Sequence, residues 1–286
     1  MKVRFGNTTL AKWFVPYVLV ASLQYQFTKD GLYYSSPFVL MSFRYVFSGI
    51  IFYFLGGRKV PLDRDALLVA AFSAGSTLPW AIGLNLVSAG DSAILSYTMP
   101  LFSIPIAWAV IKEKVVAREI LGAIVGFGGV AIYSLTLGHG SQSLGAFFTV
   151  VGAIFWGAYS VYYRKLRNRD PIPVLTTQFL VGSIPGVIGS VFYSQISPGI
   201  NLLIDVIYIV VFTGLVQFVL WNGLLRRGRV GRITTLAFAV PATTILIDSI
   251  RSFSLPSSLA VVGGVVMFSG IFISNWNRGD SEESNP

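Results

Sequence analysis

Residues Ile120 to Tyr163 read ILGAIVGFGGVAIYSLTLGHGSQSLGAFFTVVGAIFWGAYSVYY, 44 residues without one charged side chain. A helix needs roughly 20 apolar residues to cross a bilayer, so this stretch is too long for one crossing. Its middle is the Gly-rich segment Leu137–Ser141, which is typical of a turn. Basic residues flank both ends, Arg118 before it and Arg164 after it. The pattern predicts two membrane-spanning helices joined as a hairpin.

The rest of the chain has the same character. Of its 286 residues, 54% are hydrophobic and 12% are charged, and the mean hydropathy is +0.70. Soluble domains carry roughly 25% charged residues, so the composition excludes a water-soluble protein. The chain has no cysteine and a single histidine, His139, which excludes disulfides and thiolate metal sites and argues against zinc and Ser-His-Asp chemistry. No phosphate-binding Gly-rich loop precedes a helix, so we expect no cofactor and no metal.

Further charge-free runs extend the pattern to ten predicted spans. A polar tail, 278–286, is predicted to be disordered and cytoplasmic. The expected spans are 11–29, 36–56, 66–86, 92–111, 117–137, 144–163, 172–193, 203–224, 230–250 and 257–276.

The placement of the basic residues supports this count. Alternate loops hold 18 of the 21 Lys and Arg residues, whereas the opposite loops hold Lys29 and Arg251, and Arg44 falls within a span. Cytoplasmic loops carry such an excess in multi-pass membrane proteins. The net charge of +9 therefore predicts a plasma-membrane protein with both termini in the cytoplasm, and no nucleic-acid partner.

One offset, 141 residues, aligns landmarks of the two halves. It pairs Trp80 with Trp221 and Pro100 with Pro241, and it also matches three glycines, one leucine and one isoleucine. Residues 1–137 and 144–277 then each form a repeat of five spans. Two repeats with an odd number of spans lie in the bilayer with opposite orientation, as in many secondary transporters. The predicted fold class is an all-α integral membrane protein with ten transmembrane helices in a 5+5 inverted repeat.

The sequence resembles the EamA-type branch of the drug/metabolite transporter superfamily. The resemblance is carried by Phe155–Leu166, FWGAYSVYYRKL, by Tyr97–Phe102, YTMPLF, and by Lys112-Glu113-Lys114. It implies a 5+5 carrier of small organic solutes. This chain departs from the family in one respect, because Ser254 stands where the second half would repeat the acidic Glu113. The resemblance therefore implies that the second half closes by other contacts.

Two ionisable residues within spans are candidate functional groups, because charge at membrane depth is costly unless a partner or a wet cavity compensates it. Arg44 either faces a cavity and binds a carboxylate or phosphate, or it extends to the outer surface of the membrane by snorkelling or forms a structural pair with Asp30 or Asp91 there. Asp248 either pairs with Arg251 three residues away or takes up a proton during transport, which makes it the candidate for ion coupling.

Amide and aromatic side chains at membrane depth form a second group. Amides in lipid need hydrogen-bond partners and should face inward, whereas the rings either form a substrate-stacking wall or anchor the chain at the interface. Trp221 and Asn222 are interpreted as anchors. With Arg44, the predicted substrate-binding residues are Gln24, Trp80, Tyr97, Trp156, Tyr159 and Gln217.

The prolines Pro100 and Pro241 are predicted to let two helices bend symmetrically during gating. Gly122-x-x-x-Gly126 permits close helix contact, either within the chain or as the seam of a homodimer through the fifth and tenth spans. The pattern as a whole predicts a secondary carrier, not an enzyme, that moves an amino acid-like or drug-like metabolite by alternating access, with export expected. An integral membrane enzyme and a channel are the alternatives.

Overall fold

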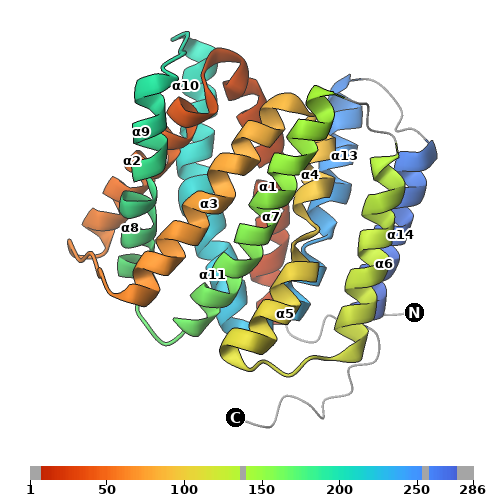
Figure 1. The fold of residues 1–286 in the computed structure, drawn as a ribbon. Helices are drawn as coiled ribbons and strands as arrows, with labels where there is room; N and C mark the ends of the chain where they lie inside the picture. Colours follow the sequence, from red (N-terminus) through yellow and green to blue (C-terminus); the bar gives the residue numbers. More distant parts are fainter. Residues whose placement is uncertain (1–7, 136–139, 253–257, 276–286) are drawn as a thin grey trace.

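The computed structural model describes residues 8–135, 140–252 and 258–275, and within these ranges it contains helices and no β-strand (Figure 1). The prediction of an all-helical protein is confirmed. A single antiparallel bridge joins Ser35 to Ile196 and ties together two connections at one end of the molecule. The predicted tail, His139 and Ser254 lie outside the described residues.

The helices follow one another with short connections. The first half of the chain forms α1 (Thr8–Tyr34), α2 (Pro37–Leu55), α3 (Arg64–Leu86), α4 (Ala89–Ser96), α5 (Met99–Ile111) and α6 (Ala117–Ser134). The second half forms α7 (Ser141–Lys165), α8 (Pro171–Gly182), α9 (Ile184–Phe192), α10 (Ile200–Ile207), the π-helix η1 (Tyr208–Val216), α11 (Gln217–Arg227), α12 (Val230–Leu236), α13 (Ala239–Ser252) and α14 (Ser258–Asn275).

Seven helical stretches of the described residues are long and apolar enough to cross a membrane. The three other predicted spans fall on α1, α6 and α14, and α14 contains a shorter apolar stretch, Val261–Gly270. The seven are Pro37–Leu55, Arg64–Leu86, Ala89–Ile111, Ser141–Lys165, Pro171–Phe192, Ile200–Arg227 and Val230–Arg251.

Helix starts are encoded by local capping residues. The Asp63 carboxylate accepts from the backbone N–H groups of Asp65 and Ala66 at the start of α3. Ser88 and Asp91 form a reciprocal capping box at the start of α4. Such side chains satisfy the N–H groups that have no partner within a helix. Local side chains therefore fix the starts of α3 and α4, whereas α5, α7 and α10 begin without a side-chain cap.

Helices from the two halves of the chain pack against each other. Figure 1 shows α3 beside α7 and α6 beside α14, and α1 also contacts α11 and α13. The α6–α14 contact is close, because a Cβ atom added to Gly270 would lie 2.5 Å from the Gly122 carbonyl oxygen. Gly122-x-x-x-Gly126 therefore packs within the chain, with small residues that let two backbones approach.

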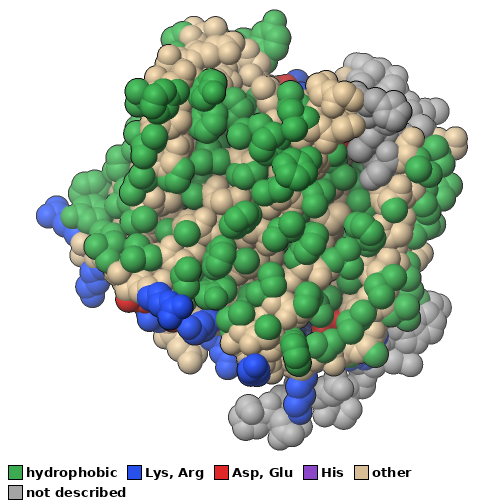
Figure 2. All heavy atoms as spheres, in the orientation of Figure 1, with side chains coloured by type: hydrophobic (Ala, Val, Ile, Leu, Met, Phe, Trp, Pro, Cys, Tyr) green, Lys and Arg blue, Asp and Glu red, His purple; other side chains and the backbone are tan. Residues whose placement is uncertain are grey.

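The outer surface is apolar across its middle and basic at one end. Figure 2 shows hydrophobic side chains over most of the visible face, whereas Lys and Arg side chains gather at the end where α3 begins and α7 ends. Large apolar side chains such as Phe54, Phe192 and Val265 are exposed. Exposed apolar surface of this extent is typical of a surface that contacts lipid or another protein.

Two helices are interrupted at matching positions. The path from α4 to α5 breaks at Tyr97 and Thr98, and the path from α12 to α13 breaks at Ala237 and Phe238. Pro100 and Pro241 lie in the first turn after each break. Proline fits a first turn, where its missing N–H costs nothing, and its ring prevents the previous helix from continuing.

Candidate functional site

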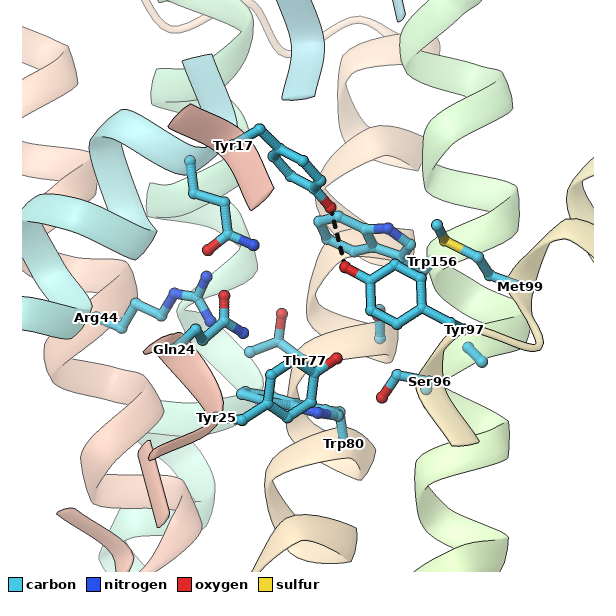
Figure 3. Close-up of a pocket in the computed structure, with 14 residues that line it drawn as sticks. Tyr17, Gln24, Tyr25, Arg44, Thr77, Trp80, Ser96, Tyr97, Met99 and Trp156 are labelled. Atoms are coloured by element: carbon cyan, nitrogen blue, oxygen red, sulfur yellow. Dashed lines mark hydrogen bonds between the residues drawn. The ribbon is translucent and has the colours of Figure 1, made fainter. Parts of the chain in front are cut away.

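A narrow cavity lies between the two halves of the chain, and side chains from both halves line it (Figure 3). Its volume is about 60 Å³, which is room for a few water molecules. The lining residues are Tyr17, Gln24 and Tyr25 of α1, Arg44 of α2, Ser76, Thr77 and Trp80 of α3, Ser96 of α4, Tyr97 at the break, Met99 of α5, Gly152, Ala153 and Trp156 of α7, and Gln217 of α11.

The structure brings six of the seven predicted substrate-binding residues to this cavity. They are Gln24, Arg44, Trp80, Tyr97, Trp156 and Gln217. Figure 3 shows Arg44 and Gln24 on one side and the Tyr97 ring and Met99 on the opposite side. The cavity thus has a polar wall and an aromatic wall, and the binding role of its residues stays a prediction.

Local backbone features place these side chains. Tyr97 occupies the break between α4 and α5, so its ring turns into the cavity. Gly152 lets α7 approach α3, because an added Cβ atom would lie 2.9 Å from the Ser76 carbonyl oxygen and 3.0 Å from the Trp80 Cβ. Gln217 directly follows η1, and π-helical turns often occur at functional sites.

Arg44 is a buried cation without a counter-ion. Its side chain is 2% exposed, its Nη2 donates to the Thr213 carbonyl oxygen at 3.0 Å, and its guanidinium lies 5.4 Å from the centre of the Phe218 ring. In the described part of the chain, no carboxylate lies within ion-pair distance of it. The alternative of a structural pair with Asp30 or Asp91 is therefore wrong for this conformation.

Four polar atoms of cavity residues are buried without any hydrogen-bond partner. Two are donors, Arg44 Nε and Trp80 Nε1, and two are acceptors, the Oε1 atoms of Gln24 and Gln217. Buried polar atoms are nearly always satisfied, and leaving one unpaired costs about 1–3 kcal/mol. Two donors and two acceptors at one cavity can bind a polar ligand that carries both an acceptor group and a donor group.

The aromatic wall is built from stacked rings. Tyr17 lies 4.9 Å from Trp221 in a stacked arrangement, and its hydroxyl is 3.3 Å from the Tyr97 hydroxyl. The Trp80 ring meets Tyr25 edge to face at 5.5 Å. Trp221 is only 1% exposed, so its interpretation as an interfacial anchor is wrong. It supports the cavity wall from behind.

Tyr159 does not reach the cavity. Its hydroxyl contacts the Asn222 Oδ1 at 2.8 Å and the Gln178 Oε1 at 3.1 Å, and the residue is fully buried. Its ring lies 5.0 Å from the Trp156 ring. Tyr159 therefore supports a cavity residue, and Asn222, which was interpreted as an anchor, is its buried partner.

Asp248 lies at the far end of α13 from the break and is half-buried. It accepts a hydrogen bond from Gln26 Nε2 at 3.1 Å, while Gln26 Oε1 accepts from Arg251 at 3.4 Å. Arg251 forms its ion pair with Asp30, at 2.7 Å. Asp248 thus belongs to a polar network across α1 and α13, and its role in ion coupling stays a prediction.

Lys29 closes one end of the space between α1 and α3. Its Nζ donates to three backbone carbonyl oxygens at the end of α3, those of Leu84 at 2.9 Å, Asn85 at 3.0 Å and Val87 at 2.8 Å. The last carbonyls of a helix have no partner within it and attract cations. Lys29 therefore fastens α1 to the end of α3.

Arg164 makes the equivalent contact in the second half of the chain. Its Nη1 donates to the carbonyl oxygens of Leu225 at 2.7 Å and Arg226 at 2.8 Å, at the end of α11. These two residues lie 141 positions after Leu84 and Asn85, the same offset that relates the two halves. Each half thus uses a cation from its first helix to fasten the end of its third predicted span.

Glu113 connects the two halves at the basic end. Its carboxylate accepts from the backbone N–H groups of Val230 at 3.2 Å and Gly231 at 3.4 Å, at the start of α12, and Arg229 lies 3.9 Å away. At the equivalent start of α4, the local pair of Ser88 and Asp91 does the capping.

Sequence reasoning missed several lining residues. Tyr17 shares the face of α1 with Gln24 and Tyr25, seven and eight positions later, so helical spacing from Gln24 could have found it. The sequence does not single out four other lining residues, because small hydroxyl and thioether side chains are common throughout membrane helices. They are Ser76, Thr77, Ser96 and Met99.

Comparison with known proteins identifies the family. The model of the EamA-like transporter family matches residues 11–135 and again residues 143–276. An uncharacterized transporter in the sor 3'region of Acidianus ambivalens is 38% identical over 239 residues, which cover 83% of this chain and 93% of that protein. A probable terminal-alkyne amino-acid exporter of Streptantibioticus cattleyicolor is 23% identical over 77% of this chain and 76% of its own.

A solved crystal structure shares the fold. Its TM-score is 0.75 at 17% sequence identity, and the match covers 93% of this chain and 97% of that one. The names of the relatives indicate membrane transporters rather than enzymes. The chain therefore belongs to the EamA-like transporter family, within the drug/metabolite transporter superfamily.

Proposed function

We propose that the protein is a secondary carrier that moves amino acid-like zwitterions through the central cavity by alternating access. The observation that carries the proposal is the set of four unpartnered buried atoms around the cavity. A carboxylate would accept from Arg44 Nε and Trp80 Nε1, and an ammonium group would donate to the Oε1 atoms of Gln24 and Gln217. A zwitterion carries both kinds of group, an acceptor for the two donors and a donor for the two acceptors.

The architecture that we propose is ten spans in two inverted repeats of five, 1–137 and 144–277. Two findings support it: the family model matches the chain twice in succession, and the breaks before Pro100 and Pro241 lie at equivalent positions. Pro100 and Pro241 then serve as the gating prolines. The resulting carrier would open its shared cavity to either side in turn.

For the orientation, we propose a plasma-membrane protein with both termini in the cytoplasm. The gathering of Lys and Arg side chains at one end supports this orientation. We propose export as the direction, which is supported by the relative named an amino-acid exporter. A homodimer that uses the outer faces of α6 and α14 stays a prediction.

The test is transport by the purified protein in liposomes. Counterflow of radiolabelled L-leucine and L-propargylglycine, a terminal-alkyne amino acid, is compared with that of a sugar phosphate and of a cationic dye. We expect saturable counterflow of the two zwitterions alone. Counterflow of the dye or the sugar phosphate instead would refute the substrate class, and flux that rises linearly with concentration would point to a channel.

A further inference from the structure

A second cavity, which we call the vestibule, opens at the end of the molecule where α10 begins (Figure 1). Its volume is about 630 Å³, and charged and polar side chains dominate its lining. The lining residues are Lys29, Asp30, Tyr33, Tyr34, Asn85, Asn201, Ile204, Asp205 and Arg251. Water therefore reaches the ends of α1, α3, α10 and α13 here.

The cations of the vestibule are already engaged. Lys29 has three N–H donors, and all three are satisfied by the carbonyl oxygens at the end of α3. Arg251 is paired with Asp30 at 2.7 Å and donates to Gln26. Neither cation therefore forms an ion pair with Asp205, which is the other acid of the vestibule.

Asp205 is a buried carboxylate that lacks a direct hydrogen-bond or ion-pair partner among the described residues. It lies in α10 immediately before η1, is 5% exposed, and packs against α1, where an added Cβ on Gly31 would lie 3.4 Å from its own Cβ. Within residues 8–135, 140–252 and 258–275, no hydrogen bond or ion pair joins its side chain. The titratable groups that face it are Lys29, Asp30, Tyr33 and Tyr34 from α1 and Arg251 from α13.

A carboxylate that is buried without a direct partner is costly, and ionisable groups inside membrane proteins often mark proton pathways. We propose that Asp205 is a proton-binding site, and that the carrier closes the vestibule only when this carboxylate has taken up one proton from the water there. The step converts a carboxylate and a proton to a carboxylic acid, and reopening returns the proton. The proposal rests on the proposed function for its effect on transport.

Asp248, the other candidate for proton uptake, provides a matched comparison at the same end of the molecule, and loss of the titration in Asp248→Asn alone would assign the proton to Asp248 instead. It is also an aspartate at the end of a predicted span, but Gln26 donates to it. Asn replaces either carboxylate with an uncharged group of nearly equal size. Asp205→Asn should therefore resemble the protonated protein permanently, whereas Asp248→Asn should leave the titration intact.

The first experiment needs no substrate. Infrared difference spectra of the purified full-length protein in lipid are recorded as the pH is lowered, and the C=O stretch of protonated carboxyl groups is followed. The other carboxyl groups of the chain titrate as well, so the component of the band that appears at the highest pH is compared. We expect this component in the wild type and in Asp248→Asn but not in Asp205→Asn. A band that persists unchanged in Asp205→Asn would refute the proton site. Size-exclusion chromatography verifies that both variants are folded.

The second experiment measures L-leucine counterflow against pH on the vestibule side. Above the titration midpoint, the protonated fraction falls tenfold per pH unit, so the wild-type rate should fall by about the same factor. Asp205→Asn should keep the low-pH rate throughout, and Asp205→Glu should restore the dependence. A wild-type profile in Asp205→Asn would overturn the gating role. Absence of any amino-acid counterflow would refute the proposed function, while the infrared titration still decides the proton site.

Discussion

At the scale of single residues, Arg44 gives the sharpest test of the central cavity. Arg44→Gln removes the only charged side chain among the described residues that line it. Hydrogen bonds to charged groups contribute about 1.5–3 kcal/mol, so we expect the KM for zwitterionic amino acids to rise roughly ten- to hundredfold. Arg44→Lys should recover part of this loss, because it keeps the charge without the planar donor geometry. Counterflow measured across a range of substrate concentrations gives the KM of each variant.

The matched control is Lys59→Gln, at an exposed position between α2 and α3. It should leave KM unchanged. An equal loss of transport for cationic and zwitterionic solutes in Arg44→Gln, with a lower unfolding temperature, would instead show that Arg44 has only a structural role through its bond to the Thr213 carbonyl oxygen.

The cavity residues that could be predicted most directly from the sequence are polar or charged side chains within apolar spans. Gln24, Arg44 and Gln217 stand out because an amide or a guanidinium within the membrane needs a hydrogen-bond partner or a wet cavity. Thr77 lines the same cavity without standing out, since its hydroxyl is common in membrane helices. Asp205 was missed because an acid near the end of a span looks like a loop residue, and only its burial against α1 distinguishes it.

At the scale of elements, the matched helix breaks predict a rate effect. Pro100→Ala and Pro241→Ala remove the ring that prevents α4 and α12 from continuing. A conformational equilibrium shifted by about 1 kcal/mol changes its populations about fivefold. We expect kcat to fall by about this factor while KM stays constant, since neither proline lines the cavity. Pro185→Ala, at the start of α9, is the control that should change neither constant.

The two helix-end contacts predict opposite changes in access to the cavity. Lys29→Met frees the end of α3, and Arg164→Met frees the end of α11. With Thr77→Cys as a reporter inside the cavity, Lys29→Met should speed labelling from the vestibule side, and Arg164→Met from the basic end. Each loses charge-assisted hydrogen bonds of about 1.5–3 kcal/mol, so the expected increase is tenfold or more.

Lys165→Met is the neighbouring control, because Lys165 forms an ion pair with Asp65 at the surface. It should leave the labelling rate unchanged. Faster labelling from the same side in both Lys29→Met and Arg164→Met would show that the two contacts do not close opposite ends.

The positions of the helices could be predicted wherever a few neighbouring residues determine where a helix begins or ends. Charge-free runs, the turn before Ser141 and the matched prolines gave nearly all helix positions, because each is a property of a few neighbouring residues. The π-helix Tyr208–Val216 was not predictable, since its sequence is mostly apolar, uncharged and without proline. Its geometry follows from tertiary contacts, among them the bonds from Ser48 and Arg44 of α2 to its carbonyl oxygens.

At the scale of the whole molecule, the proposed inversion of the repeats makes the most exacting prediction. Asn85 and Arg226 are equivalent positions, 141 residues apart. If the repeats are inverted, equivalent positions lie on opposite faces of the membrane. Asn168, just after α7, should lie on the same face as Arg226, because 144–163 and 203–224 are separated by one further span.

Because the chain has no cysteine, Asn85→Cys, Asn168→Cys and Arg226→Cys can each be made in the natural background. A membrane-impermeant maleimide applied to intact cells should label Asn85→Cys alone, and applied to inside-out vesicles it should label the other two. The basic residues near Asn168 and Arg226 give the physical reason, since positively charged loops stay in the cytoplasm. Labelling of Asn168→Cys and Arg226→Cys from different sides would mean that the span count is wrong, and with it the shared cavity between two opposed halves.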